Sequence, residues 1–230
     1  MNWDVIAEHW QLFARGVGIS LALTAGTAVL GLLLSVPLAF ARNAERRLVS
    51  APVAAFTFVI RGTPALVQLY LIYYGLSQFE AVRSSVLWPW LSNAGLCALL
   101  AFTLNTTAYT TEIFHGALKS LPRGELEAAM SFGMSRWTLV RRILAPAMLR
   151  RALPQYANEI IMLLHMSSLA GLVTLIDITG AARYVNAEFY LAFEPFITAG
   201  ALYLVITLLL VRLFAAAEQR WLVHLRPRTP

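Results

Sequence analysis

Residues 17–41, VGISLALTAGTAVLGLLLSVPLAFA, decide the fold class of this chain. The segment holds no charged residue, and its apolar run is interrupted only by glycine, serine, threonine and Pro37. A helix that crosses the hydrocarbon core of a bilayer needs about 20 mostly apolar residues. The segment therefore predicts a membrane-spanning helix, and the rest of the chain is interpreted outward from it.

The composition agrees with a chain that lies in lipid. Hydrophobic residues make up 59% of the 230 residues, and charged residues only 13%. A soluble domain of this size has too little interior to bury so much apolar side chain. We expect residues 1–230 to form one all-α integral membrane domain. Residues 1–11 carry Asp4, Glu8 and His9 without a basic region, so they do not predict a removable signal peptide.

Four further apolar stretches bring the predicted number of spans to five. Each is long enough to cross a bilayer, although residues 53–76 include Arg61 and residues 156–176 include Glu159 and His165. The four stretches are residues 53–76, 94–114, 156–176 and 196–217. Because five is an odd number, the two ends of the chain are predicted to lie on opposite sides of the membrane.

The loops between these spans carry very unequal charge. One side holds only Arg15, Arg83 and Arg183 as basic residues. The basic side is expected to be cytoplasmic, which places the N-terminus in the periplasm and the C-terminus in the cytoplasm. The net charge of +6 is thus explained by topology rather than by nucleic-acid binding. The basic side holds Arg42, Arg46, Arg47, Lys119, Arg123, Arg136, Arg141, Arg142, Arg150, Arg151, Arg220, Arg226 and Arg228.

The longest predicted cytoplasmic loop, residues 116–151, has the composition of folded helices. Residues 125–130, ELEAAM, are strong helix formers with both acidic side chains early in the run, where they suit the helix dipole. Gly133 is expected to end or bend this helix, and residues 135–144 form a second amphipathic run. The loop therefore predicts two short helices just outside the bilayer.

The first of these helices presents small and apolar residues at helical spacing, Leu126, Ala129 and Met130. Such a face suits docking into a groove on another protein. It equally suits a helix that lies on the membrane surface, and the physical pattern alone does not separate the two. Pro146 and Pro154 are expected to mark the start of the next span.

Residues 127–146 resemble the EAA loop of permeases in ATP-binding-cassette (ABC) importers. Glu127, Ala128, Ala129 and Gly133 match the motif in type and spacing, as do the later residues IL-A-P, except that Ala145 replaces a leucine. The resemblance implies a type I ABC importer fold. It also implies that these four residues belong to a coupling helix that docks in a cleft of the ATP-binding subunit.

Further segments resemble the permeases for polar amino acids. These are RGTP at 61–64 followed by VQLY at 67–70, and AYTTEIFHG at 108–116, with His115 where arginine is common. The segment LLHMSSL at 163–169 has His165 where most of these permeases carry lysine. In this it resembles the M-type subunits of histidine/lysine/arginine/ornithine and opine importers.

The resemblance implies a permease that imports basic amino acids across the bacterial inner membrane, with other polar amino acids or opines as the alternative substrates. It implies a second permease, favouring a heterodimer, together with two ATP-binding subunits and a periplasmic solute-binding protein. No phosphate loop of the GxxxxGK[ST] type is present, so we expect this chain not to be an enzyme. It is expected to hold no cofactor, with ATP and Mg²⁺ on the partner ATPase. A secondary transporter is disfavoured because no internal repeat is visible.

Ionisable residues within spans are expensive and are therefore functional candidates. Glu159, beside Asn158, is placed to hold the cationic group of a substrate, or else to form a structural ion pair. Arg61 precedes a Gly-Thr-Pro helix break, where freed backbone groups need partners. We favour an Arg61 that anchors this break against a carboxylate over one that faces the substrate pathway.

Asn105 and Thr106 form a polar patch in the third span, which is expected either to bond helices together or to contact substrate. Glu112 is expected to tie the end of this span to the loop, and His165 to be a packed, hydrogen-bonded residue. No metal site is predicted, because the four histidines are scattered. Substrate is expected to enter from the side that carries Glu80, Asp177, Glu188 and Glu194.

Overall fold

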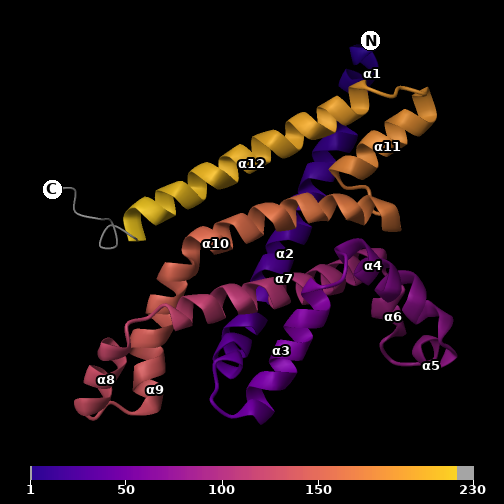
Figure 1. The fold of residues 1–230 in the computed structure, drawn as a ribbon. Helices are drawn as coiled ribbons and strands as arrows, with labels where there is room; N and C mark the ends of the chain where they lie inside the picture. The colour runs from indigo at the N-terminus through magenta and orange to yellow at the C-terminus, as the bar shows by residue number, and fades with distance from the viewer. Residues whose placement is uncertain (1, 222–230) are drawn as a thin grey trace.

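A computed structural model describes residues 2–221, and for Arg123 the backbone alone. Within these residues the chain is helical and forms no strand, which confirms the predicted all-α class (Figure 1). Arg226, Arg228 and the predicted cytoplasmic C-terminus lie outside the described residues. The helices are α1 (Trp3–Glu8), α2 (Trp10–Arg42), α3 (Arg47–Arg61), α4 (Ala65–Tyr70), α5 (Glu80–Arg83), α6 (Trp88–Leu91), α7 (Ala94–Lys119), α8 (Arg123–Ser131), α9 (Arg136–Leu139), α10 (Ala145–Met166), α11 (Ile178–Phe189) and α12 (Glu194–Trp221). Short 3-10 or π segments are η1 (Leu71–Gly75), η2 (Leu76–Gln78), η3 (Val140–Leu144) and η4 (Ser167–Val173).

Helix α7 lies at the centre of the bundle, where it packs against α2, α3, α4 and α10 (Figure 1). Its inward side chains, among them Ala98 and Phe102, are fully buried with Leu163 of α10. The contact with α2 is close because α2 places Gly31 against Thr106 of α7. Small residues at helix crossings are typical of membrane bundles, where close backbone approach replaces the hydrophobic effect.

Three of the described helical segments are long and apolar enough to span a bilayer, namely α2, the continuous helical segment from Arg136 to Val173, and α12. The chain from α3 to η2 counts as a fourth if the bent pair is one span. Helix α7 covers the remaining predicted span with 26 residues, but its polar middle keeps it from qualifying on composition. Since α7 is enclosed by other helices, it needs less apolar surface than a lipid-facing helix. The total of five spans stays a prediction.

Of the two prolines expected to mark the start of the next span, Pro146 lies at the start of α10 as predicted, whereas Pro154 does not mark a start. Helical structure runs without a stop from Arg136 through η3 into α10, and Pro154 lies inside α10. Pro146 stands in the first turn of α10, directly after the π segment η3. The ring of a proline clashes with the carbonyl four residues earlier, and a wider π turn leaves room for that carbonyl.

The predicted break after Arg61 is present, and it turns the chain by 99° between α3 and the α4–η2 segment. The Gln68 side chain donates hydrogen bonds to backbone carbonyls that have no helical partner at the break. Its Nε2 donates to the carbonyl oxygens of Ile60 (2.7 Å) and Thr63 (3.1 Å) and to the Thr63 hydroxyl (2.8 Å). Its Oε1 accepts from Nδ2 of Asn105 in α7 at 3.0 Å. Because lipid offers no hydrogen bonds, one amide side chain replaces the missing helical partners and joins the break to α7.

Helix α11 was not predicted, and Asp177 explains how it starts. The Asp177 carboxylate accepts from the backbone N–H of Gly180 (2.8 Å) and Thr179 (3.3 Å), and from the Tyr203 hydroxyl of α12 (3.0 Å). It is therefore the N-cap of α11 and links this helix to α12. Burial raises the pKa of the Asp177 carboxyl, against the opposing effect of these donors.

Of the four acidic residues predicted to lie on the side where substrate enters, two are buried in the described structure, and the side of entry itself stays a prediction. Asp177 has no exposed surface, and Glu194 is 6% exposed with Oε1 accepting the backbone N–H of Asn2 at 2.8 Å. Glu80 and Glu188 are exposed. Two of the four carboxylates thus hold helices together instead of facing solvent.

Replacing Gly16 by alanine should destabilise the bundle, because the added Cβ would lie 2.8 Å from the backbone carbonyl of Asp177. Overpacking of this kind costs about 1–3 kcal/mol. Gly18, two residues along the same helix, has nothing within 4 Å and is the matched control. We expect a lower melting temperature in detergent for Gly16→Ala, and an unchanged or higher one for Gly18→Ala. Equal melting temperatures would contradict the close approach of α2 to Asp177.

Gln68→Leu keeps the side-chain size but removes the hydrogen bonds that the Gln68 side chain makes to Ile60, Thr63 and Asn105. Leaving the buried Asn105 amide without its acceptor costs about 1–3 kcal/mol, so the melting temperature should fall. Gln78→Leu is the control, since Gln78 is exposed and makes one bond, to the carbonyl of Tyr74. A Gln68→Leu protein that melts with the wild type would show that the break is satisfied in another way.

Candidate functional site

A cleft of about 600 Å³ opens at the α3–α4 break, between the break, α7 and α10. Its wall combines apolar side chains of α10 with polar side chains from all three elements. Among the predicted pathway residues, Arg61, Asn105 and Glu159 line it together. The remaining lining residues are Gly62, Thr63, Pro64, Ala65, Tyr109, Met162, Leu163, His165, Met166 and Leu169.

Glu159 presents its carboxylate to this cleft from α10. One oxygen, Oε1, accepts a hydrogen bond from the Thr106 hydroxyl of α7 at 2.8 Å. The side chain is partly buried, and within residues 2–221 no basic group comes within ion-pair distance of it. The predicted alternative of a structural ion pair is therefore wrong for the described part of the chain. A carboxylate in this position retains capacity for a further donor.

Arg61 is the last residue of α3 and also lines the cleft. Its guanidinium stands over the Tyr109 ring, 5.2 Å from the ring centroid, and the Tyr109 hydroxyl donates to the Arg61 carbonyl at 3.5 Å. The favoured expectation, anchoring against a carboxylate, is wrong, since no acidic group of the described chain forms an ion pair with it. A cation–π contact positions the group and leaves its N–H donors available.

Asn105 and Thr106 bond helices together, which is one of the two roles expected for them. Asn105 bonds Gln68 of α4, and Thr106 bonds Glu159 of α10. Both side chains are buried. Asn105 also lines the cleft, so for this residue the structure leaves room for both roles.

Asn158 lies outside the main cleft, in a second hollow of about 370 Å³ farther along α10. This hollow shares Arg61, Tyr109 and Glu159 with the main cleft and extends to Glu112. The two spaces therefore meet along one face of α7 and α10. Polar groups follow that face from the helix break toward the end of α7.

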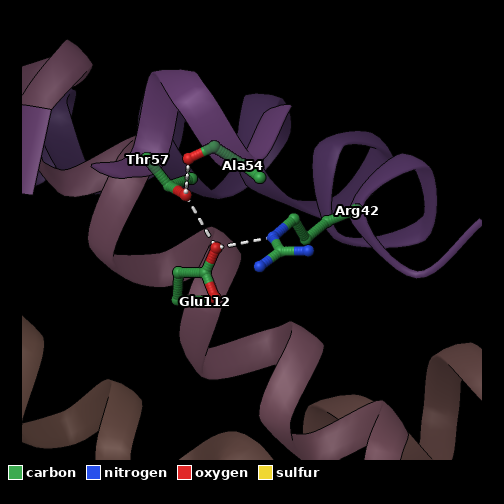
Figure 2. Close-up of polar contacts among 4 residues, drawn as sticks. All are labelled: Arg42, Ala54, Thr57 and Glu112. Carbon is green, nitrogen blue, oxygen red and sulfur yellow. Dashed lines mark hydrogen bonds and ion pairs between the residues drawn. The ribbon is translucent and has the colours of Figure 1, made fainter. Parts of the chain in front are cut away.

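Glu112 joins three helices at that end of the bundle, as Figure 2 shows. Its Oε1 accepts from Nε of Arg42 in α2 at 2.9 Å and from the Thr57 hydroxyl of α3 at 2.7 Å. The same Thr57 hydroxyl lies 3.1 Å from the carbonyl of Ala54. The expectation that Glu112 ties α7 to the following loop is thus wrong, because its partners lie on α2 and α3.

His165 is hydrogen-bonded, as expected, with Nε2 lying 3.1 Å from the Thr207 hydroxyl of α12, but the expectation that it is packed is wrong, because the residue is exposed. It also lines the cleft. Sequence reasoning missed two contributors to the site, Tyr109 and Gln68. Gln68 stands in the VQLY segment and Tyr109 in the AYTTEIFHG segment singled out above, but their partners are set by the tertiary fold. Within the described residues no group of side chains is suited to hold a metal ion, and none was predicted.

The predicted coupling segment forms a helical hairpin that projects at the opposite end of the molecule from α4–α6 (Figure 1). Helix α8 ends before Gly133, whose φ of +73° confirms that this glycine ends the helix. Ser135 caps α9 by accepting from the N–H of Thr138 at 3.3 Å. The N-cap at Ser135 agrees with the predicted start of the second amphipathic helix, residues 135–144.

The hairpin turns some motif residues inward and others outward. Ala129 is buried at 6% exposure, whereas Glu127, Ala128 and Gly133 are exposed. Beside them, Met130, Phe132 and Trp137 are 56%, 88% and 72% exposed. The hairpin thus exposes three large apolar side chains, which is unusual for a surface that meets water.

Comparison with known proteins places this architecture in a family. The model of the binding-protein-dependent transport system inner membrane component matches residues 28–223. The octopine transport system permease protein OccM of Rhizobium radiobacter is 43% identical over 91% of this chain and 86% of its own length. The histidine/lysine/arginine/ornithine transport system permease protein HisM of Salmonella typhimurium is 42% identical over 96% of this chain and 97% of its own length.

Solved structures give the same fold. The crystal structure of an amino acid ABC transporter with histidines matches with a TM-score of 0.84 and 30% identity, over 96% of this chain and 99% of that one. An inward-facing MetNI methionine ABC transporter matches with a TM-score of 0.75 over 92% of this chain and 96% of that one, and at 18% identity it supports the fold alone. The predicted type I ABC importer fold is confirmed. This chain belongs to the family of binding-protein-dependent transport system inner membrane components.

Proposed function

We propose that this permease carries basic amino acids, with its N-terminus in the periplasm and its C-terminus in the cytoplasm. ATP would be hydrolysed by separate subunits, since the chain has no phosphate loop of the GxxxxGK[ST] type. The proposed assembly has a second, different permease, two ATP-binding subunits and a solute-binding protein. ATP and Mg²⁺ belong to the ATP-binding subunits in this proposal.

The observation that carries the proposal is the unpaired carboxylate of Glu159 in the cleft. A carboxylate half-removed from water favours a cationic partner, and a charge-assisted hydrogen bond contributes about 1.5–3 kcal/mol. The ammonium, guanidinium or imidazolium group of a basic amino acid supplies such a partner. Arg61, which lines the same cleft, offers N–H donors that suit the α-carboxylate of the same molecule.

The relatives support this substrate class. The name of HisM refers to histidine, lysine, arginine and ornithine, and that of OccM to octopine. Most of this chain aligns with both proteins. Octopine is therefore the natural competitor to include when the substrate is tested.

The open side of the cleft supports a second permease. Arg61 is exposed, Phe58 is 80% exposed, and Met162 is 63% exposed. Apolar side chains beside exposed polar groups suit the meeting of two protein chains better than contact with lipid. A second chain on this face would close the pathway around Glu159.

The exposed hairpin supports an ATP-binding partner. Its outward residues include Glu127 and Ala128 of the motif together with Phe132 and Trp137. A projecting hairpin with exposed apolar side chains suits a groove on another protein. ATP-driven movement of that partner would then pull on α8 and change the access of the spans.

Glu159→Gln should lower uptake of arginine, lysine or histidine about 10- to 100-fold, because the substitution removes the charge and keeps the shape. Binding-protein-dependent uptake of labelled substrates by proteoliposomes with the assembled complex measures this. Glu8→Gln is the control, since Glu8 is exposed and lies outside the cleft. Glutamine and octopine are tested in parallel. A silent Glu159→Gln together with equal uptake of glutamine would refute the basic-substrate assignment.

Gly133→Leu should reduce transport several-fold without reducing insertion into the membrane. A left-handed conformation costs a branched residue about 1–2 kcal/mol, whereas asparagine adopts it more readily. No atom lies within 4 Å of the added Cβ, so the effect comes from the backbone turn at φ +73°. We expect Gly133→Asn to stay near wild type in uptake and in substrate-stimulated ATPase activity. Normal uptake by Gly133→Leu would argue against a role of this turn in coupling.

A further inference from the structure

A separate cavity of about 350 Å³ lies where the chain after α7 meets the start of α10. It is distant from the substrate cleft, with which it shares no lining residue. Its polar wall consists of Arg142, Arg150, Arg151 and Glu125. Its apolar wall consists of Leu121, Ile143, Pro146 and Ala147.

The cavity carries an excess of positive charge. Three guanidinium groups face one carboxylate, and none of the three forms an ion pair with an acidic side chain of the described residues. Nη1 of Arg151 donates to the carbonyl of Ser120 at 3.0 Å, which fixes this side chain against the end of α7. Arg142 and Arg150 are exposed and make no side-chain hydrogen bond within the described chain. Their donors are therefore available to an anion.

The mixed lining indicates which anion. Guanidinium groups pair with phosphate through two parallel N–H···O bonds, and several arginines suit a phosphate that keeps its charge. The apolar half of the cavity would be of no use to a free ion. It suits the glycerol and the first carbons of a lipid.

The position in the fold supports a lipid. The cavity lies at the base of α10, within the helical segment that qualifies as a span. Leu149, one turn into that helix and next to Arg150, is 42% exposed. Arginine beside exposed leucine at the end of a span is the arrangement expected at the level of lipid head groups.

We propose that Arg142, Arg150 and Arg151 form a binding site for a phosphate group, supplied by the head group of an anionic phospholipid. Arg151, held by Ser120, fixes the back of the site, and the two exposed arginines close on the phosphate. A bound lipid would bridge the end of α7, η3 and α10, and so brace the base of the hairpin.

The test is native mass spectrometry of the purified complex that contains this chain, titrated in detergent with phosphatidylglycerol or phosphatidylcholine. Arg142→Gln/Arg150→Gln removes the two free arginines. Arg136→Gln/Arg141→Gln removes the same charge from exposed positions nearby that do not line the cavity, and serves as the control. Both variants keep Arg151. A parallel titration adds inorganic phosphate alone.

We expect the wild type and the control to retain phosphatidylglycerol over phosphatidylcholine, and the cavity variant to bind it on the order of thirtyfold more weakly. Displacement of the lipid by inorganic phosphate at similar concentration would keep the phosphate site but identify a soluble anion as its ligand. Equal weakening in both variants would overturn the proposal, because general surface charge would then explain binding. Loss of the ATP-binding subunit with unchanged lipid binding would also overturn it, in favour of a protein contact.

Discussion

The rest of the structure depends on the helix break after α3, where the Gln68 side chain supplies hydrogen bonds to the freed backbone carbonyls. In a bilayer, a broken helix leaves carbonyl groups that water does not reach, so the protein itself must supply the donors. Gln68 does so for Ile60 and Thr63, and its own oxygen is held by Asn105. With these bonds in place, the chain turns by 99° and places Arg61 at the edge of a cleft in place of the middle of a straight span.

Helix α7 can carry so many polar groups because other helices enclose it. Asn105, Thr106 and Glu112 each bond a different neighbour, so α7 is tied to α4, to α10, and to both α2 and α3. Close packing against α2 depends on Gly31, where a side chain would meet Thr106. The polar face of α7 is therefore both the connection between helices and the wall of the two hollows along α10.

Local patterns predicted the helices, and long-range contacts decided the rest. Runs of apolar residues indicated where helices lie, Gly133 indicated the end of α8, and Gly-Thr-Pro indicated the break. The direction of the break and the role of Gln68 depend on Asn105, which is far away in the sequence. Pro154 failed to mark a helix start because tertiary packing continued the helix through it. For Glu112 the residue type predicted a tether, but only the fold gave its partners.

In the proposed function, Arg61 and Glu159 act together on a substrate that carries both signs of charge. Opposite charges that line one partly buried space would be expected to pair, since their attraction is stronger there than in water. Here Tyr109 holds the guanidinium and Thr106 holds the carboxylate, each from α7, and the two groups stay apart. The partly buried Glu159 carboxylate therefore loses part of its hydration without gaining an ion pair, whereas Arg61 stays exposed. In the proposed function, a zwitterionic ligand with an additional cationic group would supply an oppositely charged partner to each of the two side chains.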